Sequence, residues 1–132
     1  MTIEEIKAYF SEKREEFSSL VGIALDDISV GYCKAKLTLR PELMNSYGIV
    51  HGGCTYTLAD TVSGVAALSH GKQVVTLSGS INYLSPAANT NALYAEAKEV
   101  KYGSKIAVYD VTITNTEGDL IANGNFSLFI LD

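Results

Sequence analysis

The sequence predicts an α+β domain in which an antiparallel sheet of five to six strands wraps around one long central helix, with a further helix at the N-terminus. Three observations predict this class. Residues 51–70 form one long internal segment of helical character, most later segments alternate apolar and polar residues, and the connections between them are short. Short connections favour antiparallel neighbours, and the apolar face of a single sheet needs a helix to cover it.

The N-terminal segment, residues 3–20, is expected to form one amphipathic surface helix. Its apolar residues recur at spacings of three, four and seven with Glu and Lys between them, and they are Ile3, Ile6, Phe10, Phe17 and Leu20. Thr2 is placed to cap this helix, and Glu5 follows three residues later, as in a capping box.

Strands are expected on both sides of the long helix. Over residues 23–40 the alternation changes phase beside Gly31, which indicates a bulge or a tight turn in an antiparallel pair. A loop follows over 41–48. Residues 75–83 alternate regularly, which predicts a strand with one apolar and one polar face, and Pro86 ends it. The remaining predicted strands cover 92–102, 105–115 and 120–131.

The composition favours one packed domain over residues 1–132. Hydrophobic residues make up 47% of the chain and charged residues 19%, which is typical of a globular domain. The N-terminus has no secretory pattern and no apolar run approaches the ~20 residues of a membrane span, so we expect a soluble, cytoplasmic protein without membrane contact. The net charge of -5 argues against nucleic-acid binding, which relies on a basic surface.

A metal site and a disulfide are both disfavoured. The two histidines, His51 and His70, lack the spacing to Cys or acidic residues that is typical of metal ligands, so we expect no metal. Cys33 and Cys54 form no CxxC motif, and without a secretory signal we expect them to remain unpaired. His70 is interpreted as a residue that complements the dipole at the helix C-terminus.

The segment 51–70 is expected to be a helix with two different faces. Its larger apolar side chains should face the sheet, and they are Leu58, Val62, Val65 and Cys54. A second stripe carries almost only small side chains around one carboxylate, and it consists of Gly53, Thr57, Asp60, Gly64 and Ala67. Gly in a helix interior costs roughly 1 kcal/mol relative to Ala, so this stripe needs an offsetting contact. We expect it to face a partner subunit or a bound molecule, rather than an ordinary core that would bury Asp60 unpaired.

The start of this helix predicts a site that binds a developing negative charge. Gly52 and Gly53 put two residues without side chains at the helix N-terminus, where backbone N–H groups lack intrahelical partners and the helix dipole is positive. Such donors can approach a carbonyl oxygen closely, as in an oxyanion hole. The alternative interpretation is a flexible entry turn.

These features combine into a pattern that resembles the PaaI-like hotdog-fold acyl-CoA thioesterases. The motifs that carry the resemblance are NSYGIVHGG at 45–53, LADT at 58–61, Thr76 followed by INYLSP at 81–86, and GDLIA at 118–122. The resemblance spans roughly residues 22–130, and it implies the hotdog fold.

By this resemblance, Asp60 is the catalytic carboxylate and the Gly52 amide polarises the thioester carbonyl. Asn45 and His51 match polar groups that line the same end of the site, and Thr76 matches a hydroxyl residue that helps to hold the attacking water. The resemblance places Asp60 and Thr76 in one subunit, and Asn45, His51 and Gly52 in the other. It therefore implies a homodimer, paired again into a dimer of dimers.

The residue types suit thioester hydrolysis without a cofactor, since coenzyme A is part of the substrate. A thioester is already activated, so a carboxylate base, a positioned water and an oxyanion hole suffice. Direct attack by Asp60 through a mixed anhydride is an open alternative. Gly53, Tyr56 and Tyr83 are expected near the substrate, with the two tyrosines and the 41–48 loop as walls of an acyl pocket. The identity of the acyl group stays open.

Lys105 follows the turn at Gly103 and is a candidate for the phosphates of coenzyme A, with Arg40 as a weaker one. A solvated strand edge is the alternative interpretation of Lys98, Lys101 and Lys105. A nucleophilic pair of Cys54 with His51 is disfavoured, because a spacing of three on one helix does not align a ring nitrogen with a sulfur.

Two other functions are compatible with the hotdog fold. A hotdog dehydratase pairs His with an acid on the central helix, but here Gly-Gly follows His51 at once, and an acid nine residues later matches the thioesterase pattern better. An acyl-CoA binding module without turnover is the non-enzymatic alternative. Sensors of that kind carry an appended DNA-binding domain, for which this chain has no room, and Asp60 argues for turnover.

Overall fold

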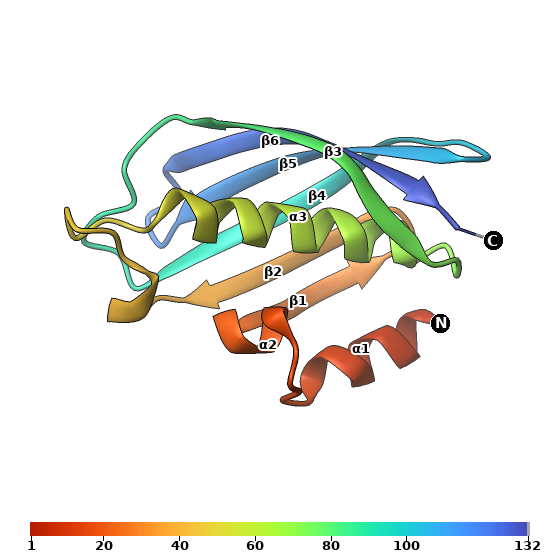
Figure 1. The fold of residues 1–132 in the computed structure, drawn as a ribbon, viewed down its shortest axis with the longest axis horizontal. Helices are drawn as coiled ribbons and strands as arrows, with labels where there is room; N and C mark the ends of the chain where they lie inside the picture. The colour runs from red at the N-terminus through yellow and green to blue at the C-terminus, as the bar shows by residue number, and fades with distance from the viewer. Residues whose placement is uncertain (132) are drawn as a thin grey trace.

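The computed structural model describes residues 1–131, and within them an antiparallel six-stranded sheet curves around one long helix (Figure 1). In chain order the elements are α1 (Ile3–Ser11), α2 (Phe17–Val21), β1 (Ile23–Ser29), β2 (Tyr32–Thr38), the 3-10 helix η1 (Pro41–Leu43), α3 (Gly52–Leu68), β3 (Val74–Tyr83), β4 (Ala92–Tyr102), β5 (Ile106–Asn115) and β6 (Leu120–Ile130). The strand order is β1-β2-β4-β5-β6-β3, which leaves β1 and β3 at the edges. The predicted α+β architecture is confirmed.

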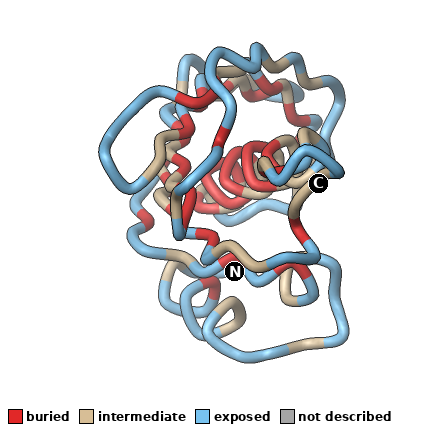
Figure 2. The backbone as a smooth tube through the Cα atoms, turned by 90° about the vertical axis from the view of Figure 1, so that its left-hand side faces the viewer, coloured by how far each residue is buried: buried red, intermediate tan, exposed pale blue. Residues whose placement is uncertain are grey.

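Helix α3 packs so deeply into the sheet because the strands beneath it carry small residues. Ala35 on β2 pairs with Ala95 on β4, and Cys33 pairs with Ala97, all four of them buried. Small side chains on paired strands let the apolar stripe of α3 approach the sheet closely. Leu58, Val62 and Val65 are buried as predicted, and Figure 2 shows the turns of α3 as the buried centre of the molecule.

The prediction of one N-terminal helix over residues 3–20 is wrong, because the segment forms two short helices, α1 and α2. The predicted capping box is present, since the backbone N–H of Glu5 donates to Thr2 Oγ1 at 3.1 Å. However, α1 ends at Ser11, and α2 begins only at Phe17. Phe17 and Leu20, expected on the buried stripe, are 64% and 70% exposed.

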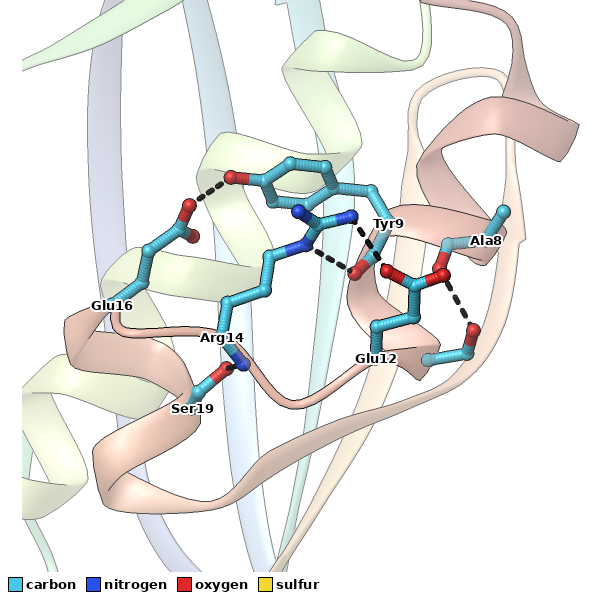
Figure 3. A network of polar contacts seen from close by, with 7 residues as sticks. Ala8, Tyr9, Glu12, Arg14, Glu16 and Ser19 are labelled. Carbon is cyan, nitrogen blue, oxygen red and sulfur yellow. Dashed lines mark hydrogen bonds and ion pairs between the residues drawn. The ribbon is translucent and has the colours of Figure 1, made fainter.

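Arg14 explains the break. Its Nε donates to the backbone oxygen of Tyr9 at 3.1 Å, and its guanidinium carbon lies 3.8 Å from the centre of the Tyr9 ring. Its backbone N–H donates to Ser19 Oγ at 3.1 Å, and the Tyr9 hydroxyl donates to Glu16 (Figure 3). Arg14 therefore satisfies a carbonyl at the end of α1 and folds the chain back toward α2.

The β1–β2 pair meets at Val30-Gly31, which confirms the tight turn predicted beside Gly31. Gly31 has a φ of +76°, and an added Cβ there would lie 2.9 Å from a carboxylate oxygen of Glu99. A residue with a side chain would therefore be strained at this position by both its backbone and its neighbour.

Strand β3 departs from the regular two-faced strand that was predicted. Its register against β6 shifts between Thr76 and Ser78, so Leu77 is bulged out of the ladder. Both Val75 and Leu77 are half-exposed, at 50% and 54%. The physical reason is that β3 is an edge strand that pairs only with β6 within residues 1–131. No helix in that range is long and apolar enough to cross a membrane.

Candidate active site

A carboxylate and a hydroxyl from two different elements meet beside the central helix. Thr76 on β3 donates its Oγ1 proton to Asp60 Oδ1 on α3 at 2.6 Å. The bond fixes the orientation of the Asp60 carboxylate and engages one of its two oxygens. No side-chain or backbone donor of residues 1–131 bonds to Oδ2, so that oxygen can accept a proton from a water molecule, as a general base must.

Asp60 and Thr76 lie in the wall of a cavity of about 660 Å³, a volume within the usual range of small-molecule sites. Three parts of the chain line it: α3, the first half of β3 with the end of β6, and the N-terminal segment. The lining residues are Met1, Tyr9, Phe10, Glu16, Ser18, Asp60, Thr61, Gly64, Val65, Leu68, Gln73, Val74, Val75, Thr76, Leu128 and Leu131. The carboxylate therefore opens into a largely apolar space.

A second group of polar atoms gathers at the N-terminus of α3. His51 is the N-cap residue, and its Nδ1 accepts a hydrogen bond from the backbone N–H of Gly53 at 2.8 Å. The N–H of Gly52 donates no hydrogen bond within residues 1–131. Of the two glycine amides expected as donors, the Gly52 amide is therefore the one that remains open to a ligand.

Tyr83 packs directly on Gly52. Its hydroxyl donates to the backbone oxygen of Gly52 at 2.7 Å, and a Cβ added to Gly52 would lie 3.3 Å from the ring. Burial raises the pKa of Tyr83, so its hydroxyl stays a donor at neutral pH. A side chain at position 52 would therefore require Tyr83 to shift by a few tenths of an ångström.

Asn45 organises the loop that leads into the helix. Its Oδ1 accepts from the backbone N–H of Tyr47 at 2.9 Å and of Ile49 at 3.3 Å. Asn45, Gly52 and Tyr83 line a second cavity of about 290 Å³, together with Ile49, Val50, Thr55, Leu84, Ser85, Pro86, Ala87 and Ile121. Of the residues predicted at the N-terminal end of α3, Asn45 and Gly52 thus line one cavity, and His51 does not.

Within one chain the two groups do not meet. No residue lines both cavities. Gly52 is the first residue of α3 and Asp60 lies eight residues later, which corresponds to about 12 Å along the helix axis. A single thioester carbonyl could not touch the Gly52 amide and a water held by Asp60 of the same chain.

The other predicted substrate contacts lie elsewhere in the chain. The Tyr56 hydroxyl donates to the backbone oxygen of Gly79 at 3.3 Å, and its ring packs edge-on against Phe126. Tyr56 lines neither cavity. Lys105 is exposed beyond the β4–β5 turn, where its backbone oxygen accepts from Ile130.

The small-residue stripe of α3 is only partly open. Asp60 and Gly64 line the larger cavity, whereas Gly53 and Thr57 lie in a shallow depression beside Phe17. Ala67, expected on the same stripe, is fully buried. A Cβ added to Gly64 would meet nothing within 4 Å, so the helix surface next to Asp60 is open space.

Neither cysteine is a competent nucleophile at neutral pH. Burial raises the pKa of Cys54, and it raises the pKa of Cys33 to about 12. The His51 nitrogen Nδ1 is already engaged by the Gly53 amide. Both cysteines are free of a disulfide, and residues 1–131 contain no group of three His, Cys, Asp or Glu side chains placed to share a metal ion.

His70 has a role that the sequence did not indicate. Its Nε2 lies 2.7 Å from Glu99 Oε1, and its ring stacks on Tyr102 at 3.6 Å. The same Glu99 oxygen accepts from the hydroxyl of buried Tyr109 at 2.7 Å. This cluster ties the end of α3 to β4 and β5, which differs from the predicted interaction with the helix dipole alone.

Sequence reasoning missed the N-terminal wall of the larger cavity. The sequence predicts Tyr9, Phe10 and Glu16 on a surface helix, whereas the turn at Arg14 places them in the same cavity wall as Asp60. No local pattern in the sequence signals this placement, because it depends on how the segment folds back onto α3.

Comparisons with known proteins agree with this arrangement. Residues 47–122 match the family model of the Thioesterase superfamily. Human acyl-coenzyme A thioesterase 13 is 34% identical over 116 residues, which cover 85% of this chain and 83% of that protein. Escherichia coli acyl-coenzyme A thioesterase PaaI is 26% identical over 87% of this chain and 82% of its own, and its structure superposes with a TM-score of 0.89 at 23% identity over 97% and 93% of the two chains.

One solved neighbour was crystallised with coenzyme A. It is the "hypothetical thioesterase protein" of Streptococcus pneumoniae TIGR4, with a TM-score of 0.79, 32% identity, and coverage of 83% of this chain and 86% of that one. Two further structures of that protein carry alanine in place of an aspartate and of a threonine, and these two positions are 16 residues apart. Asp60 and Thr76 have the same separation in this chain.

Proposed function

Because the chain belongs to the thioesterase superfamily and has the hotdog fold of the PaaI-like thioesterases, we propose that it hydrolyses acyl-CoA thioesters in a site shared between two identical subunits. Asp60 and Thr76 come from one subunit. Gly52 and Asn45 come from the other.

The observation that carries this proposal is the Asp60–Thr76 pair at the edge of an apolar cavity. The 2.6 Å bond holds the carboxylate in one orientation, and the cavity beside it has room for an acyl group. This arrangement is suited to a base that acts on an apolar acyl compound. The S. pneumoniae protein supports the ligand class, because its structure contains coenzyme A.

The edge strand β3 supports the shared site. Its outer edge has no partner strand within residues 1–131, and half-exposed Val75 and Leu77 lie along it. Antiparallel pairing of β3 with its copy would extend the sheet and cover these side chains. The start of one strand would then face the end of the other, so Thr76 would approach Tyr83 and Gly52 of the partner subunit. Pairing around a two-fold axis creates two identical sites.

The reaction follows from these positions. Asp60 accepts a proton from water, and the hydroxide attacks the thioester carbon. The carbonyl oxygen becomes an oxyanion and accepts a hydrogen bond from the N–H of Gly52 of the partner subunit, at the positive end of its helix. The carbon–sulfur bond then breaks as the carbonyl re-forms, and protonated Asp60 gives its proton to the departing sulfur, so that the carboxylic acid and the free thiol of coenzyme A are released. Direct attack by Asp60, followed by hydrolysis of the mixed anhydride, uses the same residues.

A mixing experiment tests both the activity and the shared site. Asp60→Asn removes the base, and Gly52→Pro removes the N–H donor, so we expect each variant alone to release thiol from acyl-CoA very slowly. When the two variants are unfolded together and refolded, half of the dimers are mixed, and each has one site with both groups intact. About a quarter of wild-type activity should return. If the mixture is no more active than its components, Asp60 and Gly52 do not act across a subunit interface.

A further inference from the structure

The larger cavity is closed on one side by a segment that the family match does not cover. Tyr9 and Phe10 at the end of α1, with Glu16 and Ser18 around the start of α2, face α3 and the start of β3 across this cavity. The family model begins at residue 47. The wall therefore lies in the part of the chain that precedes the family-model match.

This wall is held in place by its own contacts. The Arg14 guanidinium stacks on Tyr9 and bonds to the Tyr9 backbone oxygen, while the Tyr9 hydroxyl donates to the Glu16 carboxylate (Figure 3). Arg14 is also anchored to α2 through Ser19 Oγ. Glu16 thus keeps a fixed position at the cavity without an ionic partner of its own, since Arg14 pairs with Glu12.

The charged side chains that line the cavity are carboxylates, and the terminal amino group belongs to another lining residue, Met1. Among the side chains that line it, Glu16 and Asp60 carry carboxylates, and no Lys or Arg is present. The remaining lining is mostly apolar, with Phe10, Val65 and Leu128 from three different elements. An apolar group would gain by burial here, whereas an anionic acyl group would meet two carboxylates and no Lys or Arg side chain in the lining.

We propose that the acyl group of the substrate occupies this cavity and that the α1–α2 wall makes the enzyme selective for uncharged, apolar acyl groups, with Glu16 excluding acyl groups that end in a carboxylate. The proposal rests on the function proposed above, because Asp60 must reach the thioester at the mouth of the same cavity. Tyr9 holds Glu16 in place and is a positioning residue.

Hexanoyl-CoA and adipoyl-CoA provide a matched pair of probes, because their acyl chains have equal length and differ in the terminal carboxylate. The measurement is the ratio of their kcat/KM values. We expect the wild-type protein to favour hexanoyl-CoA by about tenfold or more, and Glu16→Gln to reduce this ratio by about fivefold, the effect of one charge at close range in water.

Glu15→Gln is the control. Glu15 is the exposed neighbour of Glu16, does not line this cavity, and its replacement changes the net charge by the same amount. It should leave the ratio as in the wild type. Equal shifts in the two variants would overturn the proposal, because a long-range field would then explain the preference.

Gly64→Leu tests occupancy independently. A side chain at position 64 would project into open cavity space one helical turn after Asp60. In a series of acyl-CoA substrates of increasing chain length, we expect kcat/KM of the wild type to rise about fourfold per added methylene until the acyl chain fills the cavity. The Gly64→Leu variant should reach its highest kcat/KM at a shorter acyl chain. An unchanged length profile in a variant that light scattering shows to be dimeric would contradict the proposal. If the variant does not dimerise, the hexanoyl-CoA to adipoyl-CoA ratios of Glu16→Gln and Glu15→Gln decide whether the proposal holds.

The two proposals fail in different ways. Wild-type protein that hydrolyses no acyl-CoA, or an Asp60→Asn variant with normal turnover, would contradict the proposed function. If hydrolysis depends on Asp60 but Glu16→Gln does not change the hexanoyl-CoA to adipoyl-CoA ratio, only the proposed selectivity of the α1–α2 wall is contradicted. The ratio can also be measured without turnover, as Kd values of hexanoyl and adipoyl thioether analogues of the two substrates.

Discussion

The backbone N–H of Gly52 can be removed by substitution with proline, without changing the side chains of Asp60, Thr76 or Asn45. Gly52 is the first residue of α3, and its N–H has no acceptor within residues 1–131. Proline is favoured at this helix position, because the N–H that it lacks makes no intrahelical bond. His51 before it has φ -60° and ψ 134°, an extended conformation that a residue preceding proline readily adopts. Gly52→Pro should therefore fold and lack only the proposed donor.

Gly52→Ala is the matched control. Both substitutions add a Cβ that would lie 3.3 Å from the Tyr83 ring, so both variants need a small shift of Tyr83, and proline alone adds two ring carbons on the side of the missing N–H. Alanine keeps the N–H and proline does not. Removal of one oxyanion-hole donor typically lowers kcat by about 10²–10³, and we expect this factor between the two variants.

The assay is steady-state release of free thiol from an acyl-CoA, followed with dithionitrobenzoate. Thermal unfolding by circular dichroism checks that both variants keep the fold. The reasoning would be refuted if the proline variant turned over as fast as the alanine variant, since the Gly52 amide would then have no part in stabilising the oxyanion.

Three further predictions concern the base, the subunit interface and a buried thiol. Asp60→Asn keeps the size and hydrogen bonding of the side chain but removes its basicity, so kcat should fall by roughly 10²–10⁴ with an unchanged melting temperature; near-normal turnover would exclude Asp60 as the base. Leu77→Lys on the edge of β3 should yield monomers in light scattering and lose activity, whereas Val100→Lys, at an equally exposed bulge of β4, should stay dimeric. Burial raises the pKa of Cys33 from 9.0 to about 12, so its contribution to stability is complete below pH 9 and falls as the pH rises, because the unfolded thiol ionises first. Between pH 9 and 10 this thiol should lower the free energy of unfolding by about 1 kcal/mol, and Cys33→Ala should remove that part of the drop in urea titrations.

The fold could be predicted because each main element follows from burial of one face. The stripe of Leu58, Val62 and Val65 and the alternation in β2 and β4 are local consequences of packing one helix on one sheet. The exceptions arise from contacts that are distant in sequence. Arg14 breaks the N-terminal helix through a tertiary contact with Tyr9, and the bulge at Leu77 disturbs the alternation of β3.

The candidate site also contains residues that the sequence predicts and residues that only the tertiary structure brings in. Asp60, Thr76 and Gly52 were predicted from motifs and the family resemblance, and the structure brings the first two into contact. Their catalytic roles stay predictions. The cavity wall of Tyr9 and Glu16 could not be predicted, since it depends on the fold-back of α1 and α2. The availability of the Gly52 amide, in contrast to that of Gly53, became evident only from the position of the His51 ring.

The eight residues that separate Gly52 from Asp60 on one rigid helix have a consequence for behaviour in solution. In the proposed shared site neither end completes the reaction alone, so turnover per protomer should decline on dilution below the dissociation constant of the proposed dimer. A defect in either end would also be carried into every mixed dimer, where it inactivates one of the two sites. Because a copy defective at one end still lends its intact end to a normal partner, co-expression should leave one working site per normal chain, whereas a copy defective at both ends should leave none in a mixed dimer.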